Sequence, residues 1–277
     1  MEEDFMTFIP QSAPSCNPLP RGDLSCLLEE MCRIAGDAGR MALSLRAAGL
    51  VSSLKADGSQ VTQADVAVGE MISARLSPLL PGVPIVCEEN IPLLAKTDMT
   101  GTFWLVDPVD ATRKFISGQD DFSVNIALVS DRYPVLGVVA GPARDVVYAG
   151  GKGIPAFCLR DGGKIRHEIH PRSIPESGAV VFATLSRSRF SDGNALDAIL
   201  GGMHVAERIY LGSALKFCAI AAGEADVYVR IGETGEWDTA AGQAILESVG
   251  CGIRTLDGMP LRYGKTGFLN ESFIATR

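Results

Sequence analysis

The stretch Asp107-Pro108-Val109-Asp110-Ala111-Thr112 carries the residues best suited to chemistry. It follows an apolar run directly, so its two carboxylates lie where a buried strand is expected to end. Burying both without a partner is costly, whereas two carboxylates and an intervening carbonyl are ligands that a hard divalent cation takes. A helix beginning at Thr112 would also present free N–H groups to an anion. The stretch indicates a metal and anion site, with simple capping of that helix as the alternative.

Two further acidic blocks lie at the ends of predicted elements, one after a strand and one before a helix. Glu88-Glu89 follows the short apolar run at 84–87, and Asp238 precedes a run of small residues that predicts a helix. Asp238 by itself could be only a helix cap. Three acidic element ends can, however, converge at one rim, as a two-metal site for phosphoryl chemistry requires.

The elements that must position these acids follow from apolar spacing. Helices are predicted over residues 24–49 and 65–80, with Thr62 placed to cap the second and an exposed hairpin or loop between them. Strands of the first half are predicted at 84–87, 103–106, 123–129, 135–140 and 146–149, with a turn at Asp131-Arg132. In the second half, strands at 179–183, 204–210, 227–229 and 253–255 alternate with helices at 193–200, 214–222 and 239–248.

This pattern predicts an α/β (α+β) chain of two packed subdomains. Residues 1–23, rich in Pro and Ser, are expected to be a poorly ordered N-terminal tail. Residues 24–150 are expected to form an α+β metal-binding subdomain with one antiparallel sheet backed by two helices. Residues 151–277 are expected to form an α/β substrate subdomain.

Composition excludes several classes of protein. The 277 residues carry a formal net charge of -8, which argues against a nucleic-acid partner because such binding needs clustered Lys and Arg. The seven Cys include no CxxC pair, which argues against a zinc ribbon and favours buried thiols in a reducing compartment. No apolar stretch is long enough for a transmembrane segment. A cytoplasmic location is expected, with peripheral association at the inner membrane and a homodimer left open.

In order and spacing, these acidic blocks resemble the magnesium-dependent, lithium-sensitive phosphatases that include inositol monophosphatase. That family's pattern is an Asp, then Glu-Glu, then Asp-Pro-Ile/Leu/Val-Asp-Gly/Ser/Ala-Thr, then Trp-Asp before small residues. This chain supplies Asp65, Glu88-Glu89, the 107–112 stretch and Trp237-Asp238, and the resemblance covers roughly residues 24–275. It implies a layered αβαβα sugar-phosphatase fold and two or three bound Mg²⁺ ions.

The resemblance also implies a role for each residue. Glu88, Asp107 and the Val109 carbonyl would bind one metal, and Asp107, Asp110 and Asp238 would hold the second. The N–H groups of Ala111 and Thr112 would face the substrate phosphate. Asp65 and the Thr112 hydroxyl would orient and deprotonate the attacking water. A catalytically inactive sensor of metal and nucleotide is disfavoured, because Asp65 and Thr112 are both present.

The flanking sequence resembles the bisphosphate nucleotidase branch of the family. Gly212-Ser213-Ala214-Leu215-Lys216-Phe217-Cys218 is similar to that branch's Gly-Ser-Ser-Leu-Lys-Phe-Cys, and Arg113-Lys114 departs from its usual Lys-Glu. The branch implies hydrolysis of 3'-phosphoadenosine 5'-phosphate, a small phosphorylated metabolite, to AMP and phosphate. Ser213, Lys216 and Arg230 would then bind the rest of the nucleotide, unless the two cations are ordinary surface charges. The alternative substrate is an inositol phosphate or another sugar phosphate.

Overall fold

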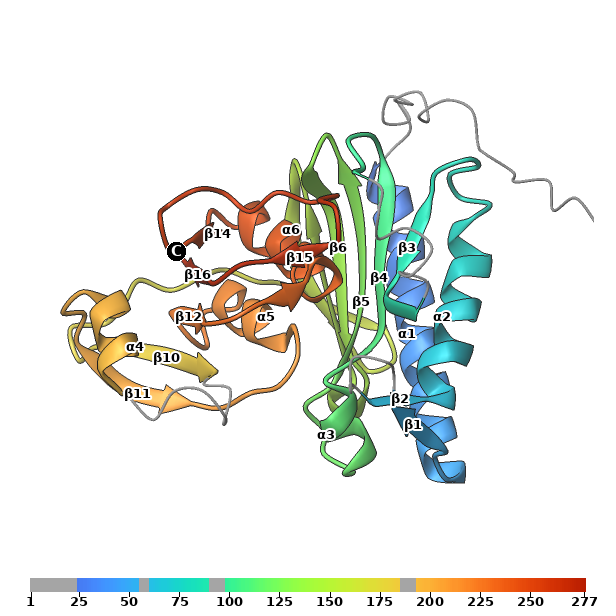
Figure 1. Cartoon of the computed structure of the whole chain (residues 1–277), viewed down its shortest axis with the longest axis horizontal. Helices are drawn as coiled ribbons and strands as arrows, with labels where there is room; N and C mark the ends of the chain where they lie inside the picture. The colour runs from blue at the N-terminus through green and yellow to red at the C-terminus, as the bar shows by residue number, and fades with distance from the viewer. Residues whose placement is uncertain (1–23, 55–59, 90–97, 185–192) are drawn as a thin grey trace, which may run out of the picture.

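The computed structural model describes residues 24–54, 60–89, 98–184 and 193–277. Two helices, a large sheet, two more helices, a smaller sheet and a last helix follow one another across the molecule (Figure 1). The predicted αβαβα layering is therefore confirmed. The predicted tail at 1–23 lies outside the described residues.

The outermost layer consists of α1 (Leu24–Ala48) and α2 (Gln63–Leu76), which lie side by side on one face of the large sheet (Figure 1). The buried residues of α1 recur every three or four positions, from Leu28 and Met31 to Ala42, which is the spacing of one helix face. Thr62 caps α2, as predicted. The predicted hairpin before α2 is present as the antiparallel pair β1 (Ser52–Leu54) and β2 (Gln60–Thr62).

The large sheet has seven strands in the order β3-β4-β5-β6-β7-β8-β9. Their bounds are β3 Ile85–Cys87, β4 Phe103–Asp110, β5 Ser123–Ser130, β6 Tyr133–Gly141, β7 Val146–Gly151, β8 Ile154–Arg160 and β9 Ile165–Glu168. The pairing is antiparallel except between β3 and β4, which run parallel, so the prediction of a wholly antiparallel sheet was wrong at this edge. The predicted turn joins β5 to β6, with Asp131 and Arg132 at positive φ. Short α3 (Thr112–Ile116) follows β4, and the 3-10 turn η2 (Pro142–Arg144) follows β6.

The middle layer is formed by α5 (Leu215–Ala221) and α6 (Ala240–Ser248). Every residue of α5 and most of α6 are buried, since the pair lies between two sheets. Close packing of α6 on β6 depends on Gly137, where an added Cβ would lie 2.2 Å from the Ala241 carbonyl oxygen. The 3-10 turn η3 (Glu236–Asp238) leads directly into α6.

The smaller sheet has five strands in the order β11-β10-β12-β16-β14. Their bounds are β10 Ala179–Thr184, β11 Val205–Ile209, β12 Val227–Arg230, β14 Gly252–Thr255 and β16 Phe273–Thr276. The last helix, α4 (Gly193–Leu200), packs on its outer side through Leu196 and Leu200. A separate two-stranded pair joins β13 (Thr234–Gly235) to β15 (Leu269–Asn270).

The large sheet extends further along the chain than expected. Five strands were not predicted: β8, which contains Pro155, β9, which is wholly exposed, the two-residue strands β13 and β15, and β16. The predicted division at residues 150 and 151 falls within β7, and the same sheet continues to Glu168. The two subdomains with those bounds stay a prediction.

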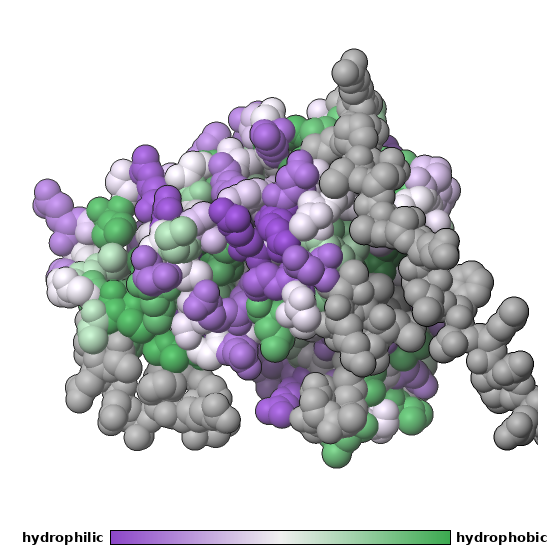
Figure 2. Space-filling view, turned by 45° about the horizontal axis from the view of Figure 1, so that its top comes forward, coloured by the Kyte–Doolittle hydropathy of each residue, from purple (hydrophilic) through white to green (hydrophobic). Residues whose placement is uncertain are grey.

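The visible surface in Figure 2 is divided by hydropathy. Hydrophilic residues gather over the middle of that face, and hydrophobic residues gather toward the end that the smaller sheet forms (Figure 2). None of the helices in the described part of the chain has the length and apolar character needed to span a membrane.

Gly137 offers a direct test of the layer contact. We expect Gly137→Ala to lower the free energy of unfolding by about 1 to 3 kcal/mol, because its methyl group must push α6 away from the sheet. The matched control is Gly252→Ala, also in a strand, where an added Cβ has no neighbour within 4 Å. Urea denaturation of both variants measures the difference. Equal stability of the two variants would contradict this account of the packing.

Candidate metal centre

Two parallel neighbouring strands place the first acids. β3 pairs with β4 so that Cys87 lies opposite Val106, and the next residues, Glu88 and Asp107, therefore come at the same edge of the sheet. The pairing of β4 with β5 then shifts between Asp107 and Asp110. Such a bulge re-aims side chains, and bulges are common beside functional sites.

Three carboxylates converge at this edge. Asp107, Asp110 and Asp238 each offer an oxygen, and these atoms all lie within 4.8 Å of one another. Burial raises the pKa of Asp107 well above its usual value, and the charges of Glu88 and Asp110 raise it further. Burial, followed by the charges of Asp110 and Glu88, does the same to the pKa of Asp238. The predicted convergence of these acids is therefore present, with Glu88 as a charged neighbour.

One carboxylate oxygen of the cluster lacks a partner. Asp107 Oδ1 accepts a hydrogen bond from the Val109 N–H at 3.1 Å. Its Oδ2 is buried and has no hydrogen-bond partner among the residues that the structure describes. An uncompensated carboxylate oxygen on a residue clustered with two further carboxylates fits a hard divalent cation, which takes oxygen ligands. The donor set therefore suits the ion that the sequence predicted.

Asp110 is held by groups that the sequence did not single out for this purpose. Its Oδ2 accepts hydrogen bonds from Ala214 N at 2.6 Å, Asn125 Nδ2 at 3.3 Å and Ser123 Oγ at 3.4 Å. Burial raises the pKa of Asp110, while the nearby Lys216 ammonium lowers it. A signal was available, because Ser123 and Asn125 are polar residues at the start of β5, before its apolar run from Ile126 to Val129.

Asp65 and Thr112 form a pair across the site. The Thr112 hydroxyl lies 3.3 Å from Asp65 Oδ1 and 3.1 Å from the Val109 carbonyl oxygen. Asp65 Oδ2 accepts from the Thr62 N–H at 2.7 Å and from the Thr62 hydroxyl at 2.5 Å. The cap that begins α2 therefore also orients the carboxylate of Asp65, which sequence reasoning missed although Thr62-x-x-Asp65 has capping-box spacing.

The predicted substrate residues surround Asp110. Ala111, directly after it, has the left-handed φ of 70° and precedes α3. Ser213, directly before Ala214, also has a positive φ, of 56°. Lys216 is buried, and its ammonium donates to the carbonyl oxygens of Ser213 at 2.6 Å and Leu211 at 3.4 Å.

The two predicted substrate cations differ in their surroundings. Burial lowers the pKa of Lys216 to about 8, partly offset by the charge of Asp110. Arg230, at the end of β12, donates from Nη2 to the Glu233 carbonyl at 3.2 Å, while its Nε is buried without a hydrogen-bond partner among the described residues. The alternative interpretation was that Lys216 and Arg230 are ordinary surface charges. It is wrong for Lys216, because that side chain is buried.

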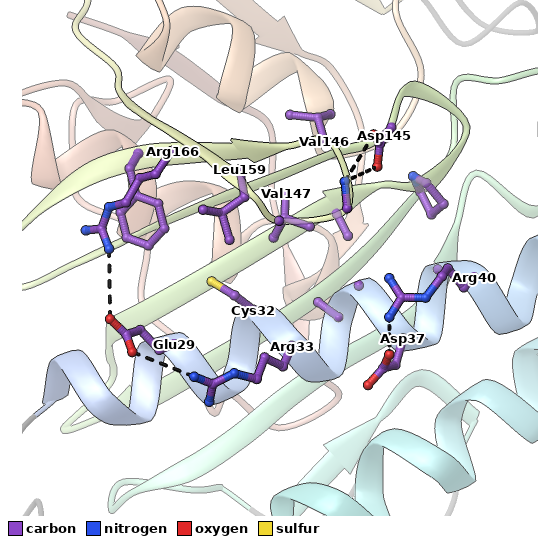
Figure 3. A pocket seen from close by; sticks show the side chains of 18 of the residues that line it. Glu29, Cys32, Arg33, Asp37, Arg40, Asp145, Val146, Val147, Leu159 and Arg166 are labelled. Atoms are coloured by element: carbon purple, nitrogen blue, oxygen red, sulfur yellow. Dashed lines mark hydrogen bonds and ion pairs between the residues drawn. The ribbon is translucent and has the colours of Figure 1, made fainter.

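A separate pocket of about 680 Å³ lies between α1 and strands β7 and β8 (Figure 3). The Arg166 guanidinium stacks on Phe157, 3.6 Å from the ring centroid, and lies 4.0 Å from Glu29. Asp37 and Arg40 pair on the opposite rim (Figure 3). None of the predicted site residues lines this pocket, and its ionic groups pair largely with one another.

Comparison with known proteins agrees with this layered fold and its acidic rim. The family model described as "Inositol monophosphatase family" matches residues 23–276, and the chain belongs to that family.

Three of the similar proteins described next are named CysQ, and the fourth is named SuhB. The chain is 36% identical to the 3'(2'),5'-bisphosphate nucleotidase CysQ of Salmonella typhimurium, covering 90% of this chain and 99% of the relative. It is 34% identical to CysQ of Escherichia coli (strain K12), covering 89% and 98%. The crystal structure of CysQ from Bacteroides thetaiotaomicron matches with a TM-score of 0.73 at 32% identity, covering 92% and 98%. Mycobacterium tuberculosis SuhB matches with a TM-score of 0.68 at 26% identity, covering 91% and 90%.

The carboxylate cluster predicts that the stabilisation of the fold by Mg²⁺ depends on pH. Carboxyls whose pKa is raised by folding stabilise the fold below their unfolded pKa and lose that contribution as the pH rises through the folded pKa. For Asp107 and Asp238, we therefore expect Mg²⁺, compared with excess EDTA, to raise the melting temperature more at about pH 8 than at about pH 5.

Thermal unfolding in both conditions at both pH values measures this. The difference in melting temperature between Mg²⁺ and EDTA cancels the contribution of carboxylates elsewhere whose pKa is lowered, such as Asp121. Asp238→Asn removes one charge from the cluster and should shrink the effect. An Mg²⁺ shift that is the same at both pH values would contradict the expectation.

Proposed function

We propose that this protein is a Mg²⁺-dependent phosphatase that hydrolyses the 3'-phosphate of 3'-phosphoadenosine 5'-phosphate, giving AMP and phosphate. The observation that carries the proposal is the group of three carboxylates within 4.8 Å, with the unpartnered Asp107 Oδ2 among them. Support for this substrate comes from relatives named 3'(2'),5'-bisphosphate nucleotidase, which this chain covers almost completely. Hydrolysis of an inositol or other sugar phosphate is the alternative.

The acids would divide between two metal positions. Glu88, Asp107 and the Val109 carbonyl would hold one Mg²⁺, and Asp107, Asp110 and Asp238 would hold the second. Bound Mg²⁺ would neutralise the phosphate, lower the pKa of a water molecule and stabilise the leaving oxygen. The Thr112 hydroxyl has one proton, so its donation to Asp65 would leave the Val109 carbonyl available to the metal.

Thr112 and Asp65 would handle the proton of the attacking water. The Thr112 hydroxyl can donate to Asp65 Oδ1 and accept a hydrogen bond from water at the same time. Asp65 keeps a fixed orientation, because both donors of Thr62 hold its other oxygen. This pair would orient the water and accept its proton as the water attacks phosphorus in line. The N–H groups of Ala111 and Thr112 would donate to the phosphate oxygens.

The second phosphate of the nucleotide needs cations away from the carboxylates. Arg230 is a candidate because its planar guanidinium can grip phosphate at two points and its Nε has no hydrogen-bond partner among the described residues. Ser213 and Lys216 would complete this subsite. Two of the Lys216 protons already go to carbonyl oxygens, which leaves one for a ligand.

Inhibition by lithium and a cytoplasmic location also belong to this proposal. The first follows from the family resemblance and the second from the sequence, and each stays a prediction. A homodimer and peripheral association with the inner membrane stay open.

Phosphate release from three substrates tests the proposed function. We expect the wild type to prefer 3'-phosphoadenosine 5'-phosphate over inositol 1-phosphate and fructose 1,6-bisphosphate, to lose activity in EDTA and to regain it with Mg²⁺. Arg230→Ala should raise KM for the nucleotide by about 10- to 150-fold, the equivalent of one charged hydrogen bond. Inositol 1-phosphate, which lacks a second phosphate, is the matched control. Preference of the wild type for inositol 1-phosphate would favour the alternative, and full activity in EDTA would overturn the metal assignment.

A double-mutant cycle tests the proton-accepting pair. Thr112→Ala and Asp65→Asn should each lower kcat by about 10²- to 10⁴-fold, since a positioned acid–base group contributes that much. Because the two residues would act as a unit, the double variant should fall little further. Thr112→Ser keeps the hydroxyl and is the control, and it should retain most of the activity. Fully additive losses in kcat would show that the two residues do not share one task.

A further inference from the structure

A second buried acid lies close to the carboxylate cluster without belonging to it. Glu236 begins η3, two residues before Asp238, and its exposed fraction is 0%. A carboxylate in such surroundings has to be paired and hydrogen-bonded. The partners of Glu236 therefore show what fixes this turn.

Among the described residues, the hydrogen-bond and ion-pair partners of the Glu236 side chain come from one segment near the C-terminus. Glu236 Oε2 accepts from the Gly264 N–H at 2.5 Å. Its Oε1 accepts from the Lys265 N–H at 3.1 Å and lies 2.6 Å from the Lys265 ammonium. That ammonium also donates to Asn270 Oδ1 at 3.0 Å. Glu236 thus joins η3 to residues 264–270 through charged and neutral hydrogen bonds.

The same segment is attached to the large sheet. The Met99 N–H donates to the Gly264 carbonyl at 2.8 Å, and the Tyr263 N–H donates to the Arg132 carbonyl at 3.1 Å. Gly264 has a φ of 78°, and an added Cβ would lie 2.0 Å from the Met99 carbonyl oxygen, so the approach needs glycine. The segment is therefore fixed to the stretch that leads into β4 and to the turn between β5 and β6, strands of the sheet that carries Asp107 and Asp110.

Asp238 needs such a support because of its own charge. It stands on a turn of three residues, and its carboxylate accepts a hydrogen bond from the Gly235 N–H at 3.0 Å. One of its oxygens lies within 4.8 Å of a carboxylate oxygen of Asp107 and of Asp110. Repulsion between these carboxylates would push η3 away from β4 unless another contact held the turn in place.

We propose that Glu236 is a positioning residue for Asp238. Its buried ion pair with Lys265 holds η3 against the large sheet, so that the Asp238 carboxylate stays within reach of Asp107 and Asp110 before the metal binds. This inference rests on the proposed function in one respect, namely that Asp238 is a metal ligand. It assigns Glu236 an effect on metal affinity, and no contact with metal or substrate.

Metal binding by Glu236→Gln tests the proposal. The amide has nearly the same shape but lacks the charge that pairs with Lys265. Residues that orient metal ligands typically change metal affinity by about 10- to 100-fold when mutated, and we expect a loss of that size in Mg²⁺ affinity. Calorimetric titration of the metal-free protein with Mg²⁺ measures it without relying on activity. At saturating Mg²⁺, KM for 3'-phosphoadenosine 5'-phosphate should change by less than about twofold, because Glu236 does not touch the substrate.

Asp226→Asn is the matched control. Asp226 is also buried and paired, with Arg172 at 2.9 Å and the Val180 N–H at 2.7 Å, and it lies at the opposite end of β12 from Arg230. Both variants should lower the melting temperature, but Asp226→Asn should bind Mg²⁺ as the wild type does. Lys265→Gln removes the cation from its half-exposed side and should reproduce the weaker Mg²⁺ binding, even if Glu236→Gln does not fold.

The outcomes separate this inference from the proposed function. Wild-type Mg²⁺ affinity in both Lys265→Gln and a folded Glu236→Gln would overturn the positioning role. An equal loss of affinity in Asp226→Asn would also overturn it, since the effect would then be general destabilisation. Asp238→Asn tests the underlying assumption: if it binds Mg²⁺ normally, the metal assignment itself fails.

Discussion

Mutual repulsion among three closely spaced carboxylates constrains the whole arrangement of layers. Asp107, Asp110 and Asp238 bring oxygens within 4.8 Å of one another, and burial weakens the screening that water would supply. Such a group is stable only if protons or cations compensate its charge and a rigid frame prevents the residues from moving apart. The layered fold supplies the frame, since the first two acids belong to the large sheet and the third to the turn that leads into the middle layer.

The frame works through contacts made far from the acids. Gly137 lets α6 approach the large sheet, and that approach brings η3 and Asp238 to the end of β4. The parallel pairing of β3 with β4 places Glu88 at the same edge. Polar groups behind the cluster then fix single carboxylates, as Ala214 N does for Asp110 at 2.6 Å. Local motifs supply the charges, whereas tertiary packing decides where they meet.

This division explains how far the sequence could predict the structure. Features set by neighbouring residues were accessible: the cap at Thr62, the turn at Asp131-Arg132 and the bounds of α4 and α6 all follow from local patterns. The placement of the acids at element ends indicated that they could converge, and their order in a known family then assigned each a ligand role. Contacts between distant segments left no local signal, as with Glu236 and Lys265. The parallel pairing of β3 was missed for the same reason, since strand direction depends on the whole chain path.

Two of the seven non-glycine residues with positive φ in the described part of the chain lie beside Asp110. Ala111 and Ser213 both have positive φ, at 70° and 56°, although each carries a Cβ. Such a conformation costs roughly 1 to 2 kcal/mol per residue and persists only where the surroundings impose it. Both residues adjoin the Asp110 contact, one directly after Asp110 and the other directly before Ala214, whose N–H binds its carboxylate. If Ala111 or Ser213 relaxed to a negative φ, the N–H groups beside Asp110 would move. The strain is therefore retained at the place where the phosphate and the Mg²⁺ ion would have to be bound together.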